Sequence, residues 1–325
     1  MKIAVVGCGA VGSFYGARLC RAGQDVHFLL RSDYEIVRRH GVRIRSPEGD
    51  FNARPRCARS AGEIGESDLV VIALKTTANG EFSRLLPSLV GKQTAILTLQ
   101  NGLGNEEKLA ELFPVEQILG GMCFVCLNRI EPGVIQHLAH GRIVLGEFKR
   151  WPEPRTHDIA SMFRHAGVNC KVADNLAQAH WEKLVWNIPF NGLGAAGARG
   201  CAVVAGRGSD DQDPKVAGAC LTTDLLLADP RWETLVREVM LEVIHSGQAL
   251  GYQLAESLVE KNIDRTRAMG AYKASTLLDL EAGRPLELEG LFLEPLRQAR
   301  EAGVAVPRLE ALCDFLSRRS ASIAR

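Results

Sequence analysis

Hydrophobic residues change their spacing about halfway along the chain. Up to about residue 172, short apolar and β-branched runs alternate with segments of helical period, which is typical of a parallel sheet with crossover helices. Strands are predicted at residues 2–6, 25–30, 69–74, 94–97, 122–127, 134–137, 142–145 and 168–172. A helix is predicted at residues 10–22, and Ser32 with Glu35 predicts a capping box that opens another helix.

From about residue 175 onward only the helical period remains. Helices are predicted at residues 177–188, 221–228, 232–250, 254–273, 290–302 and 308–319. Residues 200–218 are rich in glycine and aspartate, which predicts an exposed loop. The sequence therefore predicts an α/β Rossmann-type parallel-sheet domain over residues 1–174, followed by an all-helical domain over residues 175–325.

Charge and hydropathy limit the partners of the chain. The 39 lysines and arginines against 38 acidic residues give a net charge of +1, so no nucleic-acid partner is expected. No apolar run is long enough to cross a bilayer, so no membrane association is expected. The first strand pattern begins directly after Met1, with no recognisable secretory leader.

The cysteines indicate a compartment rather than a site. Nine of them, an odd number in a chain without a leader, are typical of a reducing environment, and we expect a cytoplasmic protein. Cys123 and Cys126, followed by His137 and His140, resemble the spacing of zinc ligands. Cysteines three residues apart on a strand face opposite sides, however, so no metal site is predicted.

A glycine-rich turn separates the first predicted strand from the first helix. It has the form G-x-G-x-x-G and consists of Gly7, Cys8, Gly9, Ala10, Val11 and Gly12. The three glycines suit a tight turn, a close approach of the backbone to a pyrophosphate, and close packing of helix on strand. The helix N-terminus adds free N–H groups for phosphates. We therefore predict dinucleotide binding; the alternative is a glycine-rich turn without a ligand.

The residue at the end of the second strand bears on the choice of dinucleotide. Enzymes that select NAD usually place an acidic residue about 20 positions after the glycine motif, where it holds the ribose 2′-hydroxyl. This chain has Arg31, whose planar guanidinium suits the 2′-phosphate of NADP. The prediction is NADPH. Two alternatives stay open, a solvated surface arginine and an ion pair of Arg31 with Asp33.

Two further polar residues follow predicted strands. Lys75 comes after strand 69–74, and Asn101 comes after the run that begins at Thr94. Ligands of open α/β sheets bind outside the carboxyl ends of the strands, so both side chains are candidates for the nicotinamide end of a cofactor. The alternatives are an ordinary loop lysine and a turn formed by Asn-Gly.

The helical half carries a polar stripe on an otherwise apolar segment. Lys183, Asn187 and Asn191 recur every fourth residue and share one helix face, with a bend expected at Pro189. A partly desolvated lysine there could donate a proton near neutral pH, although its stem could equally pack while its ammonium reaches water. Further on, the helix of Ser275 is predicted to stop near Gly283.

Pro285 prevents continuation of that helix, and Glu287 then stands near the start of the next one. A carboxylate is favoured at such a position, so capping is the simple interpretation of Glu287.

Taken in this order, these motifs resemble the ketopantoate reductase family over nearly the whole chain. The glycine motif, Lys75, Gln100-Asn101-Gly102, Lys183 with its two asparagines, and the segment from Ser275 to Glu287 carry the resemblance. It implies hydride transfer from NADPH to the ketone carbon of 2-dehydropantoate, giving pantoate for pantothenate and coenzyme A synthesis. Helical second domains of this kind commonly form subunit interfaces, so a homodimer is expected.

The resemblance also implies a role for each candidate residue. Lys183 is implied as the general acid and Glu287 as a second catalytic carboxylate. The implied substrate contacts are Asn101, Lys183, Asn187, Asn191 and Ser275. The implied cofactor contacts are Gly7, Cys8, Gly9, Ala10, Val11, Gly12, Arg31, Lys75 and Asn101.

One departure from the family pattern leaves the substrate open. Tyr272 stands three residues before Ser275, where members assigned to ketopantoate often have asparagine. A reductase of another 2-oxo acid is therefore an alternative. A non-catalytic NADPH-binding sensor is a further alternative, although it predicts loss of the polar residues that this chain retains.

Overall fold

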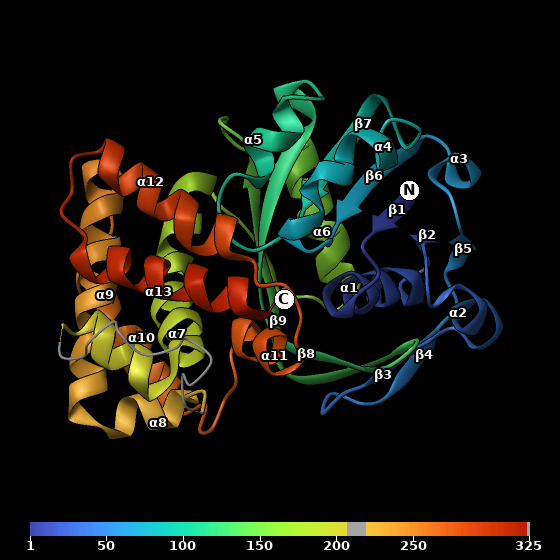
Figure 1. Cartoon of the computed structure of the whole chain (residues 1–325). Helices are drawn as coiled ribbons and strands as arrows, with labels where there is room; N and C mark the ends of the chain where they lie inside the picture. Colours follow the sequence, from blue (N-terminus) through green and yellow to red (C-terminus); the bar gives the residue numbers. More distant parts are fainter. Residues whose placement is uncertain (207–218, 324–325) are drawn as a thin grey trace. The chain divides into compact units, whose positions relative to one another are not determined.

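A computed structural model describes residues 1–206 and 219–323 of the chain (Figure 1). The chain divides into two compact units, Met1–Ala177 and Gln178–Arg325. None of the helices in the described ranges is both long and apolar enough to cross a membrane.

Unit 1 is built on a mixed, mostly parallel sheet. Its strands are β1 (Lys2–Val6), β2 (Asp25–Leu29), β3 (Val42–Arg45), β4 (Phe51–Ala53), β5 (Arg56–Ala58), β6 (Ser67–Ile72), β7 (Val90–Thr98), β8 (Ile118–Glu131), β9 (Val134–Glu147) and β10 (Cys170–Val172). The order across the sheet is β4-β3-β9-β8-β7-β6-β1-β2-β5, and β10 pairs with β9. The part β5-β2-β1-β6-β7-β8 is parallel throughout and has the Rossmann strand order, which reverses direction beside β1. The predicted fold class is confirmed.

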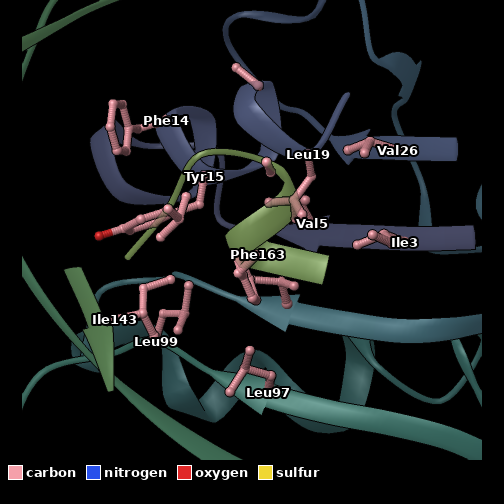
Figure 2. Close-up of a cluster of buried hydrophobic side chains, with 14 of the residues drawn as sticks. Ile3, Val5, Phe14, Tyr15, Leu19, Val26, Leu97, Leu99, Ile143 and Phe163 are labelled. Atoms are coloured by element: carbon pink, nitrogen blue, oxygen red, sulfur yellow. The ribbon is translucent and has the colours of Figure 1, made fainter. Parts of the chain in front are cut away.

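Helices bury both faces of this sheet. They are α1 (Ala10–Arg21), α2 (Tyr34–His40), α3 (Ala61–Ile64), the 3₁₀ turn η1 (Thr76–Glu81), α4 (Phe82–Leu85), α5 (Asn105–Ala110), the 3₁₀ turn η2 (Val115–Gln117) and α6 (Pro154–His165). Ile3 and Val5 of β1 pack with α1 and α6 on one face, as Figure 2 shows, while Ala4 and Val6 pack with α3, α4 and α5 on the other. Burial on both faces explains why the central strands are continuously apolar.

The structure differs from the predicted elements of unit 1 at several helices and strands. Helices α3, α4, α5 and α6 and the turns η1 and η2 were not predicted. Strands β3, β4 and β5 were not predicted, because runs of three or four residues with alternating polar positions carry little signal. The two strands predicted at 134–137 and 142–145 are one strand, β9, with an irregularity at His140 and Gly141, which both have positive φ. The predicted capping box is wrong: α2 starts after Asp33 without a side-chain cap, and the Ser32 hydroxyl donates to Asp33 instead.

Strands β8 and β9 form a long antiparallel hairpin. It leaves the parallel part of the sheet and pairs through β9 with β3, so that β3 and β4 lie beside it (Figure 1). The hairpin turn thereby comes close to the loop that follows β2. The side chain of Asp33 in that loop accepts a hydrogen bond from the backbone N–H of Gly133 in the turn, at 3.1 Å.

Unit 2 is helical. It contains α7 (Leu176–Val204), α8 (Thr223–Ala228), α9 (Pro230–Ala249), α10 (Leu258–Arg267), α11 (Ser275–Glu281), the π-helical turn η4 (Glu289–Leu293), α12 (Glu294–Glu301) and α13 (Pro307–Ile323). The predicted loop at 200–218 is wrong over residues 200–204, which belong to α7, and its residues 207–218 lie outside the described part of the chain. Helix α10 is shorter than the predicted 254–273.

Helix α7 runs through Pro189 and changes direction further on. We expected the bend at the proline; the residue with non-helical backbone angles is Gly197, at φ 71° and ψ 179°. The guanidinium of Arg319, from α13, donates to the carbonyl oxygens of Ala195 and Ala196, the latter at 3.0 Å. Interrupting a helix leaves carbonyls without their usual partners, and Arg319 supplies donors for two of them.

Candidate functional site

The glycine turn after β1 can be built only from glycine at its first position. Gly7 has φ +96°, and a Cβ on it would lie 2.4 Å from the backbone nitrogen of Leu74. Gly12 is restricted for a different reason, because its Cβ would lie 2.3 Å from the carbonyl oxygen of Gly7. Both positions therefore bring the turn, helix α1 and the end of β6 closer together than any side chain permits.

Gly9 is open where the other two glycines are crowded. A Cβ on Gly9 would meet nothing within 4 Å, and the residue is exposed. Helix α1 begins directly after it at Ala10 without a side-chain cap, so the N–H groups of the first turn have no acceptor from a capping residue. Open space in front of an uncapped helix N-terminus suits a phosphate. The turn fits a dinucleotide.

Cys8, the second residue of the turn, is held within it. Its thiol lies 3.5 Å from the carbonyl oxygen of Val5, and its own carbonyl accepts a hydrogen bond from the Ser13 hydroxyl at 2.9 Å. Burial, with a smaller effect of Cys57 and Asp33, raises the pKa of the thiol well above its ordinary value. Cys8 therefore stays protonated near neutral pH and is no thiolate nucleophile.

Strand register places the other unit 1 candidates at the same edge of the sheet. Val6 of β1 lies opposite Leu29 of β2 and Ile72 of β6, and Ile72 lies opposite Thr98 of β7. Each strand is followed within three residues by a candidate residue, and these are Gly7, Arg31, Lys75 and Asn101. The carboxyl edge next to the reversal of strand order is where ligands of such sheets bind.

Arg31 and Asp33 do not pair with each other. Within the described ranges the exposed guanidinium of Arg31 has neither a hydrogen bond nor an ion pair. The carboxylate of Asp33 is buried and bound by Arg129. The alternative of an ion pair between Arg31 and Asp33 is therefore wrong.

A chain of buried amides fixes the loops that carry Lys75 and Asn101. The Gln100 side chain donates to Asn79 at 2.7 Å, Asn79 donates to Asn105 at 2.9 Å, and Asn105 donates to the carbonyl oxygen of Asn101 at 3.2 Å. Asn79 lies on η1, and η1 begins directly after Lys75. The amides therefore join the loop after β6 to the loop after β7. Asn79 and Asn105 were not predicted as site residues, since only the fold brings them together.

In unit 2 the predicted polar stripe of α7 is present. Lys183 is half-buried, Asn187 is 7% exposed and Asn191 is 3% exposed, on a helix whose other neighbours are largely buried. No side-chain hydrogen bond joins Asn187 to another residue in the described part of the chain, and its amide atoms are not fully enclosed. A buried amide without a protein partner has its hydrogen-bonding capacity available to a ligand or to water.

Asn191 and Ser275 lie together. The Asn191 side-chain oxygen accepts from the Ser275 hydroxyl at 3.2 Å and from the backbone N–H of Thr276 at 3.0 Å. Helix α11 begins at Ser275 with no side-chain cap of its own, so Asn191 supplies an acceptor for its first turn. The structure therefore gives Asn191 a structural task in addition to any contact with substrate.

Glu287 is buried in the extended segment after α11. It is 6% exposed and stands immediately before the helical turn that begins at Leu288. The segment is held in place because the Arg284 side chain donates a hydrogen bond from Nε to the Asp279 carboxylate at 2.9 Å. Helix α11 ends before Gly283, which has φ +62°, as predicted.

Tyr272 lies three residues before Ser275 and beside α7. Its ring centroid is 6.3 Å from that of Trp186, whose ring in turn lies 5.1 Å from that of Phe190. The Tyr272 backbone is fixed, because its N–H donates to the Thr223 hydroxyl at 3.1 Å. Asn187 and Trp186 are consecutive, so an aromatic surface adjoins the polar stripe.

His137, the first histidine of the zinc-like spacing, is bound by protein groups. The buried His137 ring lies within hydrogen-bond distance of the Ser46 hydroxyl and of the His140 carbonyl oxygen, both at 2.9 Å. Both ring nitrogens are therefore engaged by protein groups.

The sheet order, the glycine turn and the helical second unit define a two-unit protein of Rossmann type. Residues 3–150 match the family described as "Ketopantoate reductase PanE/ApbA", and residues 216–320 match the family described as "Ketopantoate reductase PanE/ApbA C terminal".

Relatives match over the full length. The 2-dehydropantoate 2-reductase of Nostoc sp. is 38% identical over 317 residues, 96% of this chain and 92% of that protein. A crystal structure of 2-dehydropantoate 2-reductase from Geobacter metallireducens is 45% identical with a TM-score of 0.88, covering 98% of this chain and 99% of that one. The enzyme from Methylococcus capsulatus is 34% identical with a TM-score of 0.86, covering 100% and 98%. The chain belongs to the ketopantoate reductase family, a family of oxidoreductases.

Proposed function

We propose that the protein reduces the ketone of 2-dehydropantoate to the hydroxyl of pantoate with NADPH. The observation that carries the proposal is the polar stripe of α7, in which buried Asn187 has no partner within the described residues and Asn191 is joined to Ser275. An all-apolar helix face would stabilise the fold better, so the retained polar groups indicate a ligand. The name shared by the Nostoc and Geobacter relatives supplies the substrate.

Unit 1 is assigned the cofactor. Gly9 leaves space for the pyrophosphate at the N-terminus of α1, and exposed Arg31 offers its guanidinium to the 2′-phosphate. Lys75 and Asn101 are assigned to the nicotinamide end, at the carboxyl edge of β6 and β7. When bound, the nicotinamide supplies the hydride. The amide chain of Gln100, Asn79 and Asn105 keeps both loops in one arrangement before binding.

Unit 2 is assigned the substrate and the proton. Lys183 lies one helical turn before Asn187, so an oxygen held by the Asn187 amide is within reach of its ammonium group. Lys183 donates the proton that the carbonyl oxygen gains as the ketone is reduced, and its charge stabilises that oxygen in the transition state. Asn191 and Ser275 orient the hydroxyl and carboxylate of the substrate, and the Glu287 carboxylate orients Lys183 and substrate.

A reductase of another 2-oxo acid is the second candidate. The ring of Tyr272 beside that of Trp186, next to Asn187, gives the polar stripe an aromatic border. Such a border favours a larger apolar substituent on the substrate. Removal of the ring by Tyr272→Asn should shift the ratio of kcat/KM toward 2-dehydropantoate if the border selects a larger acid.

The test is oxidation of NADPH and of NADH with 2-dehydropantoate and a panel of other 2-oxo acids. We expect 2-dehydropantoate and NADPH to give the highest kcat/KM. Lys183→Ala should lower kcat by ~10²–10⁴-fold while the Kd for NADP⁺ stays unchanged, since general acids contribute about that much. Lys261→Ala is the matched control, because Lys261 is an exposed lysine on α10. Full turnover by Lys183→Ala would refute the assigned mechanism, and tight NADP⁺ binding without any turnover would favour the sensor.

A further inference from the structure

Two residues of opposite charge satisfy the spacing that decides between NAD and NADP. Arg31 stands 19 residues and Asp33 stands 21 residues after Gly12. An acidic residue about 20 positions after the glycine motif holds the ribose 2′-hydroxyl of NAD, whereas an arginine accommodates the 2′-phosphate of NADP. Spacing alone therefore fits both dinucleotides, and the difference must come from where the two side chains point.

The carboxylate of Asp33 is fully used by the protein. Asp33 is only 6% exposed. Its carboxylate accepts hydrogen bonds from two nitrogens of Arg129: Nε donates to Oδ2 at 3.0 Å, and Nη2 donates to Oδ1. The backbone N–H of Gly133 adds a bond of 3.1 Å, and the Ser32 hydroxyl adds one of 2.9 Å. Two oxygens that accept four hydrogen bonds have little capacity left for a ribose.

The partners of Asp33 come from a distant part of the chain that is itself held. Arg129 lies on β8, and Gly133 lies in the turn of the β8–β9 hairpin with φ +71°. The carbonyl oxygen of Gly133 accepts the backbone N–H of Arg43, at the start of β3, at 2.9 Å. The hairpin turn is thus bound on one side by β3 and on the other by Asp33.

Arg129 is the residue that compensates the charge of Asp33. A buried carboxylate without an opposite charge is strongly unfavourable, so loss of Arg129 would drive Asp33 out toward water or toward another cation. Among the described residues, the nearest cation in sequence without an ion pair is Arg31, two residues away. An Asp33 carboxylate released next to Arg31 would repel a 2′-phosphate and accept a 2′-hydroxyl instead.

We propose that Arg129 is a positioning residue for cofactor choice: it binds and neutralises the carboxylate of Asp33, so that Arg31 alone meets the ribose substituent and the site selects the 2′-phosphate. The inference rests on the proposed use of NADPH. It concerns the cofactor alone and is independent of which 2-oxo acid is reduced.

The experiment measures the Kd of NADP⁺ and of NAD⁺ by calorimetry on the full chain. Arg129→Met should raise the Kd of NADP⁺ by roughly tenfold or more, while the Kd of NAD⁺ stays the same or falls. Calorimetry resolves a tenfold change in Kd well. The double variant Arg129→Met with Asp33→Asn should recover NADP⁺ binding to within about threefold of the wild type, because no charge is then released. Arg43→Met is the matched control, since Arg43 forms an exposed ion pair with Asp50 beside the same hairpin.

Several results would overturn the proposal. Equal weakening of both dinucleotides by Arg129→Met would mean that Arg129 only supports the fold. Failure of the double variant to recover NADP⁺ binding would exclude the neutralising role, as would equal binding of NAD⁺ and NADP⁺ by the wild type. If Arg129→Met does not fold, the double variant and Arg129→Lys, which keeps the charge, still test it: both should retain the NADP⁺ preference. Failure of 2-dehydropantoate turnover would refute the proposed substrate and leave these binding results unaffected.

Discussion

Two glycines of the turn, Gly7 and Gly9, should respond differently to substitution by alanine: the first should lose stability and the second should lose dinucleotide affinity. Gly7→Ala places a methyl group 2.4 Å from a backbone nitrogen, at a residue with φ +96°. The left-handed conformation costs an alanine ~1–2 kcal/mol, and forcing neighbours apart in a packed region costs ~1–3 kcal/mol. Together these terms give about 2–5 kcal/mol.

For a unit of this size, that loss lowers Tm by on the order of 10 °C. Gly9→Ala places its methyl group where nothing lies within 4 Å, at φ −75°, which alanine adopts freely. We expect its stability to stay within ~0.5 kcal/mol of the wild type. Its Kd for NADP⁺ should nevertheless rise by at least roughly tenfold, because the methyl group occupies the space where the backbone must approach the pyrophosphate.

Thermal unfolding and calorimetric titration with NADP⁺ measure the two effects separately. Gly62→Ala on α3 is the matched control, since its Cβ also meets nothing within 4 Å, far along the chain from the turn. It should leave the Kd unchanged and the Tm no lower than that of the wild type, because alanine favours a helix over glycine. The reasoning is refuted if Gly9→Ala binds NADP⁺ like the wild type, or if it loses as much Tm as Gly7→Ala.

Three further predictions concern buried groups. Asn191→Ala removes the acceptor for Ser275 and for the N–H of Thr276, so urea unfolding should show a loss of ~1–3 kcal/mol; Asn187→Ala should cost less stability and raise KM for the 2-oxo acid more, and the reverse order would contradict these assignments. Burial raises the pKa of Cys170, Cys201 and Cys313 to about 12, so their thiols should resist alkylation near neutral pH until urea is added, as mass spectrometry can show. Because the unfolded thiols ionise near their ordinary pKa of 9.0, the stability that these groups contribute is present below pH 9 and should be lost as the pH rises toward 12. Rising stability over that range would contradict the burial.

The sequence predicted the parallel strands because burial on both faces makes them continuously apolar. Leu69–Ile72 and Val5–Val6 stand out from their surroundings for this reason. It failed at β3 to β5, whose three or four residues alternate and end before a period can be recognised. It also failed at the end of α7, where glycines suggested a loop and helix packing instead kept residues 200–204 helical. Tertiary contacts, absent from any local pattern, decide such segments.

Spacing predicts which candidate residues share a helix face, but not which residues elsewhere in the chain they contact. The four-residue repeat of Lys183, Asn187 and Asn191 survives in the structure as one stripe, because helix geometry is regular. The repeat does not reveal that Asn191 binds the start of α11, where Thr276 stands 85 residues further along the chain. The same holds for Asp33: sequence proximity left an ion pair with Arg31 open, whereas in the structure Asp33 binds Arg129.

The residues of the amide chain, of which Asn79 and Asn105 were not predicted, share one physical feature that explains their place next to a site. Asn79, Gln100 and Asn105 are each at most 8% exposed. Each donates a side-chain hydrogen bond to another amide or to a loop carbonyl. Buried amides are costly unless they are paired, so a chain of them persists where it fixes something that apolar packing cannot. What it fixes here is the relative position of the loops after β6 and β7, which carry Lys75 and Asn101. Residues that hold a loop in this way belong to the function as much as those that touch a ligand, because a loop set before binding spares the ligand the cost of ordering it.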